Sequence, residues 1–202
     1  MILSHTSSLV FISNPKTATR TIETALSSVQ EEPELDSLFE RGLYRRRHVP
    51  AAVLQRILPA RVWDNYFKFA FVRNPWDWFA SLHYYSRAKR ELPPPRVPFR
   101  VDEVCDTYEH CRNSRGVPWC ESACQHAYVC DANGRPLVDF VGRFEKLEEH
   151  FKHVVLSVGI DSRLSHLNRT SHPHYTTLYS ARTRALIGRL YSQDISIFDY
   201  AF

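Results

Sequence analysis

Residues 11–26 read FISNPKTATRTIETAL, and this stretch decides the fold class of the chain. A short apolar run within residues 8–13 predicts a buried strand, and Asn14-Pro15 ends it. Apolar residues then recur at the spacing of an amphipathic helix, at Ile22, Ala25, Leu26 and Val29. We expect Thr17 or Thr19 to cap that helix. The stretch therefore predicts a strand, a tight loop and a helix.

The same order of elements returns in residues 67–89, which read FKFAFVRNPWDWFASLHYYSRAK. Aromatic and β-branched residues predict a strand over residues 67–72, which ends at Arg73-Asn74-Pro75. A helix is predicted over residues 76–89, because proline is accepted at helix starts and Asp77 suits the positive first turn.

The rest of the chain continues the alternation. A helix is predicted over residues 51–57, between two prolines. A strand, a turn at Gly142 and a helix over about residues 145–158 follow later, and a last helix covers about residues 177–191. This order predicts an α/β fold with a central, mainly parallel sheet flanked by helices, and ligands of such sheets bind where the strands end. We expect a single domain over residues 1–202, with an irregular insertion rich in proline and cysteine at about residues 91–137.

Composition and charge narrow the classes of function. The chain has 202 residues, 44% of them hydrophobic, and a net charge of +4. That charge mildly favours an anionic ligand and is too small to indicate nucleic-acid binding. No apolar run reaches the roughly 18 residues of a membrane span, and the N-terminus does not resemble a signal peptide. We therefore expect a cytoplasmic protein. The sequence leaves its oligomeric state open.

All five cysteines lie between Cys105 and Cys130. Only Cys120-x₃-Cys124 has the close spacing of a zinc ligand pair. Thiols, a disulfide and a structural zinc site therefore all stay open, with thiols favoured in a reducing compartment. The sequence assigns no metal site.

The two Asn-Pro loops carry residues suited to anions. Lys16 and the threonines after it offer a positive charge and hydroxyl donors at the start of a helix, which suits a phosphate or sulfate. The alternative is a capped helix with a solvated lysine. Arg73 and Ser81 form a second such group, and the alternative for Arg73 is a surface salt bridge with Asp77. Together the two groups predict a ligand with two anionic groups.

These motifs resemble the sulfotransferases that use 3′-phosphoadenosine 5′-phosphosulfate (PAPS). PKTATRT is similar to their 5′-phosphosulfate loop, and FVRNPWDWFASLHYY is similar to their 3′-phosphate segment. VDFVGRFEKLEEHF and the closing region from His166 resemble the carbohydrate-type branch, which includes short bacterial members. The resemblance implies a P-loop-NTPase-like sulfotransferase fold and PAPS as the co-substrate.

The resemblance also implies roles for individual residues. Lys16 would bridge the sulfuryl group and the leaving phosphate oxygen. Arg73 and Ser81 would hold the 3′-phosphate, and Asn168-Arg169 would close over the nucleotide. The 5′-phosphosulfate would be lined by Thr17, Ala18, Thr19, Arg20 and Thr21. Arg20 departs from the small hydroxyl residue of the family pattern, so its role is open.

A base is still needed to deprotonate the acceptor. His48 resembles the base histidine of the family and has a suitable ordinary pKa. Its alternative is a capping or surface histidine, and His83 is the next candidate. The predicted reaction is sulfuryl transfer from PAPS to a hydroxyl of a sugar or a small natural product. Two other hypotheses are a kinase with a divergent phosphate loop and a non-catalytic module that binds a nucleotide or a partner.

Overall fold

The computed structural model describes residues 1–31, 48–113, 124–165 and 172–202. The chain forms two compact units. The first unit comprises Met1–Val72 and Gln125–Asn168, and the second comprises Arg73–Cys124 and Arg169–Phe202.

The first unit is built on a sheet in the order β1-β2-β3-β4. Its strands, among the described residues, are β1 (Ile2–Ser4), β2 (Leu9–Ile12), β3 (Phe67–Val72) and β4 (Phe140–Arg143). β2, β3 and β4 run parallel, and β1 pairs antiparallel with β2. The predicted α/β class with a mainly parallel sheet is therefore confirmed. The strand β1 was not predicted, because three residues are too few to show an alternating pattern.

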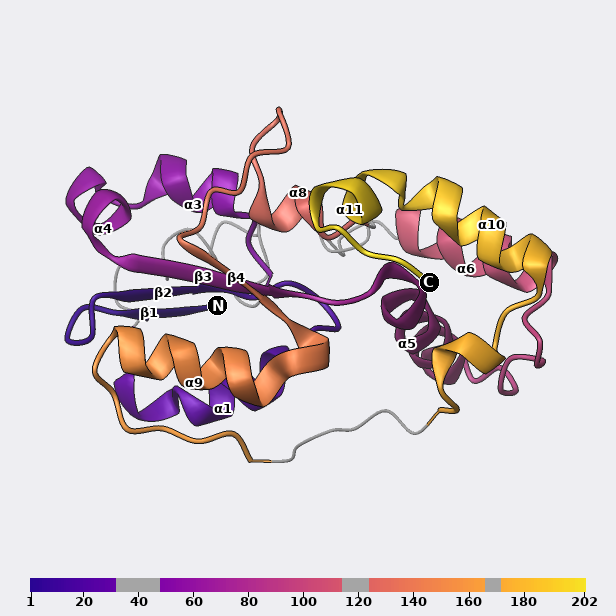
Figure 1. Cartoon of the computed structure of the whole chain (residues 1–202), viewed down its shortest axis with the longest axis horizontal. Coiled ribbons are helices and arrows are strands. Elements are labelled where there is room, and N and C mark those ends of the chain that lie inside the picture. The colour runs from indigo at the N-terminus through magenta and orange to yellow at the C-terminus, as the bar shows by residue number, and fades with distance from the viewer. Residues whose placement is uncertain (32–47, 114–123, 166–171) are drawn as a thin grey trace. The chain divides into compact units, whose positions relative to one another are not determined.

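Helices cover both faces of this sheet (Figure 1). On one face lie α1 (Thr19–Ala25) and α9 (Leu147–Ser157), and on the other lie α3 (Ala51–Ile57), α4 (Ala60–Asn65) and α8 (His126–Val129). Short 3₁₀ turns at Ser27–Val29 and Phe144–Lys146 follow α1 and precede α9. The helix predicted over residues 51–57 is confirmed, and α4 was not predicted.

Aromatic rings form the core between the sheet and the α1–α9 face. Phe11 and Phe69 are register partners on β2 and β3, and their rings stack with centroids 4.8 Å apart. Gly142 lies inside β4, so the turn predicted there is wrong. A Cβ at this position would lie 2.5 Å from Cε1 of Phe71. The glycine is therefore required by the approach of that ring and not by a turn.

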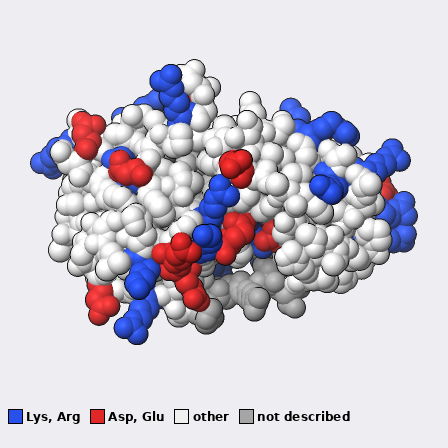
Figure 2. Space-filling model, in the orientation of Figure 1, with Lys and Arg blue, Asp and Glu red and all other residues white. Residues whose placement is uncertain are grey.

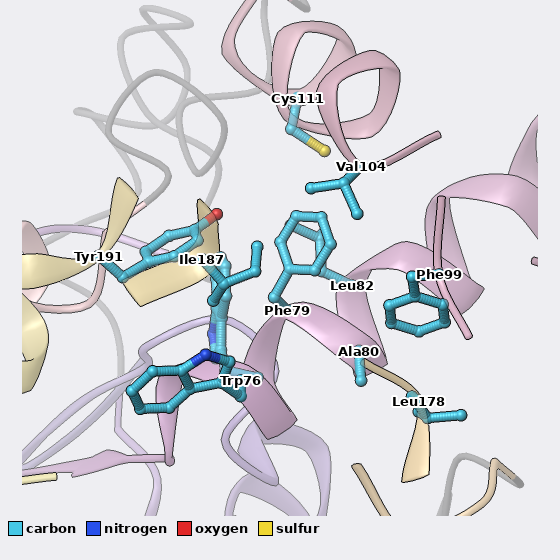
Figure 3. Close-up of a cluster of buried hydrophobic side chains, with 11 residues drawn as sticks. Trp76, Phe79, Ala80, Leu82, Phe99, Val104, Cys111, Leu178, Ile187 and Tyr191 are labelled. Atoms are coloured by element: carbon cyan, nitrogen blue, oxygen red, sulfur yellow. The ribbon is translucent and has the colours of Figure 1, made fainter. Parts of the chain in front are cut away.

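The second unit is helical. Its described elements are α5 (Pro75–Lys89), α6 (Val101–Asn113), a 3₁₀ turn at Tyr175–Thr177, α10 (Ala181–Leu190) and α11 (Ser192–Ile197). Side chains from α5, α6 and α10 meet in one buried cluster that includes Phe79, Val104, Ile187 and Tyr191 (Figure 3). The predicted helix over residues 76–89 is confirmed with one added residue, Pro75, at its first position.

The region predicted to be irregular contains α6, so that prediction is wrong for residues 101–113. Val104 and Cys111 are buried against α5 and α10, and acidic Asp102 and Glu103 occupy the first turn. Cysteine, threonine and tyrosine on the inner face hid the periodicity, since these residues count as weakly hydrophobic in a pattern.

Among the described cysteines no disulfide forms, and burial raises the pKa of the Cys124 thiol to about 12.

The last helix begins later than predicted. Ser180 caps α10 through a reciprocal pair of hydrogen bonds with Thr183, which fixes the start at Ala181.

Basic side chains gather over α10, where Arg182 and Arg189 are exposed, whereas the surface over α1 and α9 carries both positive and negative charges (Figure 2). No helix among the described residues has the length and apolar character needed to cross a membrane.

Candidate active site

The loop between β2 and α1 takes its shape from two residues with left-handed backbone conformations. Lys16 has a φ of 62° and Ala18 has a φ of 63°. Glycine enters this region without steric conflict, whereas a residue with a Cβ atom is disfavoured by about 1–2 kcal/mol. The chain thus makes this left-handed loop without glycine. Such strain persists only where surrounding contacts over-determine the backbone, and it clusters at functional sites.

Threonine hydroxyls supply part of that support. Thr17 Oγ1 donates to the carbonyl oxygen of Asn14 at 2.8 Å, and Thr19 Oγ1 donates to the same oxygen at 2.7 Å. The predicted threonine cap is therefore wrong: Ala18 is the N-cap residue of α1, and no side chain caps it. Both hydroxyl protons are therefore used inside the loop.

The Asn14 side chain fastens the loop to the neighbouring strand. Its Nδ2 donates to the Phe71 carbonyl oxygen of β3 at 2.9 Å and lies 3.5 Å from Gln125 Oε1. Its Oδ1 is buried and has no hydrogen-bond partner among the described residues. This role of Asn14 was not predicted from the sequence. The repeated Asn-Pro pair was the available signal, since an asparagine at a strand end often bonds to backbone groups.

The remaining loop residues differ in exposure. Lys16 and Ala18 are half-buried, Thr21 is buried, and Arg20 is exposed on α1. No hydrogen bond or ion pair links the Arg20 guanidinium to another residue that the structure describes. Arg20 therefore lies on the solvent side of α1, between two buried threonines.

His48 belongs to the same unit as this loop. Its Nδ1 lies 2.8 Å from the Ser13 carbonyl oxygen, at the end of β2. A carbonyl oxygen only accepts, so Nδ1 carries the proton and donates it. In the neutral ring Nε2 is then the basic nitrogen. The fold thus holds His48 beside the start of the Lys16 loop and fixes the tautomer of its neutral ring.

In the second unit, Arg73 is held by an acidic residue one turn into α5. Arg73 Nε donates to Asp77 Oδ2 at 2.7 Å, and the two side chains are only 9% and 16% exposed. A surface salt bridge with Asp77 was the alternative to a binding role for Arg73. The salt bridge exists, but it is largely buried.

The start of α5 is fixed by further hydrogen bonds. Asn74 Oδ1 accepts from the Trp76 backbone N–H at 3.1 Å, and Asn74 Nδ2 donates to the Ala201 carbonyl oxygen at 2.7 Å. Tyr179 donates its hydroxyl proton to the Trp76 carbonyl oxygen at 2.6 Å. Burial raises the pKa of Tyr179 well above its ordinary value, so the phenol stays a donor.

Ser81 and His83 lie further along α5. Ser81 is only 1% exposed, so it offers little surface to a ligand in this structure. His83 is fully buried, lies between the rings of Phe79 and Phe99, and bonds through Nδ1 to Thr107 Oγ1 at 2.7 Å. Burial lowers its pKa to about 4. These contacts favour a structural role for His83. The predicted residues Asn168 and Arg169 lie outside the described part of the chain.

Comparison with known proteins defines the class. A model described as "Sulfotransferase family" matches residues 1–201, which is nearly the whole chain. The chain therefore belongs to the sulfotransferase family, whose members are enzymes that transfer sulfuryl groups. The family predicted from the Lys16 and Arg73 motifs is therefore confirmed.

Two individual proteins are similar to this chain. An uncharacterized protein of Archaeoglobus fulgidus is 27% identical over 119 residues, which covers 57% of this chain and 87% of that protein. A crystal structure of mouse sulfotransferase SULT7A1 complexed with PAP aligns with a TM-score of 0.46 and 13% identity. That alignment covers 99% of this chain and 91% of the mouse chain.

Proposed function

We propose that this protein transfers a sulfuryl group from PAPS to a hydroxyl group of a sugar or a small natural product, with His48 as the general base. The family match over residues 1–201 supports sulfuryl transfer in general. The observation that carries the finer proposal is the 2.8 Å bond between His48 Nδ1 and the Ser13 carbonyl oxygen. It supports the proposal, because it fixes the neutral His48 ring as the tautomer with a basic Nε2, in the unit that carries the Lys16 loop.

The Lys16 loop would bind the 5′-phosphosulfate. Its left-handed residues turn the backbone sharply, and successive N–H groups in such turns form concavities that bind anions. The inward hydroxyls of Thr17 and Thr19 keep this backbone in place. The Lys16 ammonium would then neutralise charge that develops on the leaving phosphate oxygen. Ala18, Arg20 and Thr21 would complete the lining.

In this reaction His48 would accept the proton that the acceptor hydroxyl loses. The acceptor hydroxyl oxygen forms a bond to sulfur, while the bond between sulfur and the 5′-phosphate oxygen breaks and leaves its electron pair on the phosphate. The hydroxyl proton passes to His48 Nε2. The imidazolium that results keeps its Nδ1–H bond to the Ser13 carbonyl oxygen, which stabilises the positive charge. The products are a sulfated acceptor and adenosine 3′,5′-bisphosphate.

Arg73 and Ser81 would bind the 3′-phosphate of the nucleotide. The arginine is suited to this task because a planar guanidinium matches phosphate geometry. For Ser81 the side chains that cover it would have to move, since the hydroxyl is buried in this structure. Asn168 and Arg169 remain proposed contacts on the strength of the family resemblance alone.

The test combines binding and turnover. We expect calorimetry to show binding of adenosine 3′,5′-bisphosphate by the purified chain, and we expect PAPS turnover with a panel of phenols and sugars as acceptors. His48→Asn should lower turnover by about 10²–10⁴-fold and leave nucleotide binding nearly unchanged. His153→Asn, at an exposed position on α9, is the matched control and should leave both unchanged.

Three results would count against the proposal. An absence of nucleotide binding would refute the use of PAPS. Turnover of ATP with Mg²⁺ in place of PAPS would favour the kinase hypothesis. Full turnover by His48→Asn would remove the histidine from the mechanism and leave sulfuryl transfer to be explained without a side-chain base at this position.

A further inference from the structure

The ion pair between Arg73 and Asp77 carries an inference beyond the family motif. Arg73 Nε and Asp77 Oδ2 lie 2.7 Å apart, and both side chains are largely covered by protein. In the sequence this pair competed with phosphate binding as an explanation of Arg73. In the structure only Nε donates to Asp77 in this bond, and the other donors of the guanidinium belong to its two terminal nitrogens. The bond to Asp77 through Nε therefore does not itself use the terminal nitrogens.

We propose that Asp77 is a positioning residue for the nucleotide: its carboxylate fixes the Arg73 guanidinium so that the terminal nitrogens are presented to the 3′-phosphate. This inference rests on the proposed function, because it assigns a role at the same nucleotide site. Asp77 does not contact the phosphate and acts only through Arg73.

The position of Asp77 suits this role. Asp77 lies in the first turn of α5, where the helix dipole favours a negative charge, and it stands four residues after Arg73. The start of α5 is itself fixed by Asn74, through its bonds to Trp76 and Ala201. The carboxylate is thus attached to a rigid support. A support of this kind is needed to hold a binding group in its productive geometry.

Burial explains why the support is needed. Arg73 has a long side chain with several rotatable bonds, and a buried guanidinium without a partner is strongly unfavourable. The Asp77 carboxylate compensates that charge when no nucleotide is bound. It also removes rotational freedom that nucleotide binding would otherwise have to restrict, which is the general advantage of preorganisation.

Positioning and charge make opposite predictions for the loss of Asp77. A carboxylate near a phosphate repels it, so electrostatics alone predicts that Asp77→Ala binds the 3′-phosphate more tightly. Positioning predicts weaker binding, because the guanidinium is held less firmly when the Asp77 contact is lost. The direction of the change therefore decides between the two explanations.

The experiment measures how much the 3′-phosphate contributes to affinity. Dissociation constants are measured by calorimetry for adenosine 3′,5′-bisphosphate and for adenosine 5′-monophosphate, which lacks the 3′-phosphate. The readout is the ratio of the two constants. We expect a large ratio for the unaltered chain and a ratio about tenfold to a hundredfold smaller for Asp77→Ala, which corresponds to the loss of a charge-assisted contact.

A matched control removes an equal charge from the same unit. Asp106 pairs with Arg90 at 2.6 Å in a more exposed ion pair, with the two side chains 47% and 28% exposed. Asp106→Ala should leave the ratio unchanged. In an Arg73→Ala background, Asp77→Ala should no longer lower the ratio, because Asp77 acts only through that arginine.

The outcomes separate this inference from the proposed function. If the unaltered chain binds neither nucleotide, the proposed function fails. If it binds both nucleotides equally, the 3′-phosphate adds nothing to affinity. Arg73 then makes no useful contact with that phosphate, and the positioning role of Asp77 fails. If the ratio is large but Asp77→Ala leaves it unchanged or raises it, only the positioning role is overturned.

Should Asp77→Ala not fold, Asp77→Asn takes its place. Its neutral and weaker hydrogen bond should lower the ratio at least about threefold, and an equal or higher ratio refutes the role.

Discussion

Replacing Ala18 by glycine should stabilise the protein, although the same replacement destabilises most helices. Ala18 has φ 63° and ψ 23°, which is the left-handed region. Relief of the Cβ conflict contributes about 1–2 kcal/mol in favour of the glycine variant. The larger conformational freedom of glycine in the unfolded chain opposes this by about 0.4–1 kcal/mol. The net expectation is a gain of about 0.8 kcal/mol in the free energy of unfolding.

The matched control is Ala52→Gly in α3, which belongs to the same unit and has ordinary helical geometry. Glycine at this position should lower the free energy of unfolding by about 0.5–1 kcal/mol. The two variants carry the same chemical change, so their difference of about 1.5 kcal/mol isolates the backbone conformation. It corresponds to roughly 3–6 °C in Tm for a chain of this size.

Urea unfolding followed by circular dichroism measures both variants under identical conditions. The result that refutes the reasoning is a loss of stability for Ala18→Gly equal to that of Ala52→Gly. Such a loss would mean that the Ala18 methyl group makes packing contacts worth more than the relief of strain.

Three further predictions follow from buried groups and the loop. Gly142→Ala should lower the free energy of unfolding by about 1–3 kcal/mol in urea titrations, because the new Cβ would lie 2.5 Å from the Phe71 ring, and an unchanged midpoint would contradict the close approach. Lys16→Ala should lower PAPS turnover by about 10²–10³-fold with little change in Tm, whereas an equal loss of both would make Lys16 structural. Because the pKa of buried His83 is lowered to about 4 from 6.5, its neutral form stabilises the fold fully above pH 6.5. That stability, about 3 kcal/mol by linkage, should be lost as the pH falls from 6.5 towards 4, and His83→Gln should flatten this part of the pH profile of Tm.

Sequence patterns predicted the elements that are long or sharply bounded. The strand over residues 67–72 and the helix over residues 51–57 agree with the structure, because prolines and continuous apolar runs mark their limits. α6 was missed, since its buried face is made of Val104, Cys111 and other residues that a hydrophobic pattern weights weakly. Gly142 was misassigned to a turn because the sequence does not reveal that Phe71 packs against it.

In the candidate active site, too, some features could be predicted from the sequence and others could not. The sequence indicated Lys16 and Arg73 from their residue types and their places after strand ends, and it indicated His48 through the family resemblance. It could not predict that the Thr17 and Thr19 hydroxyls are turned inward, because threonine at a helix start is usually a cap. It also could not predict which nitrogen of His48 carries the proton, since the Ser13 carbonyl that decides this lies 35 residues earlier in the chain.

The sequence by itself determined the alternation of strands and helices, the two Asn-Pro loops and the family, because these follow from local periodicity and from motifs a few residues long. Only the tertiary structure decided how the loop residues are used. It assigned Asn14 to the backbone of β3, gave Arg73 a buried partner in Asp77, and enclosed His83 between aromatic rings. The reason is physical: hydrogen bonding and burial depend on which distant groups are brought within about 3 Å, and a linear pattern carries no such distances.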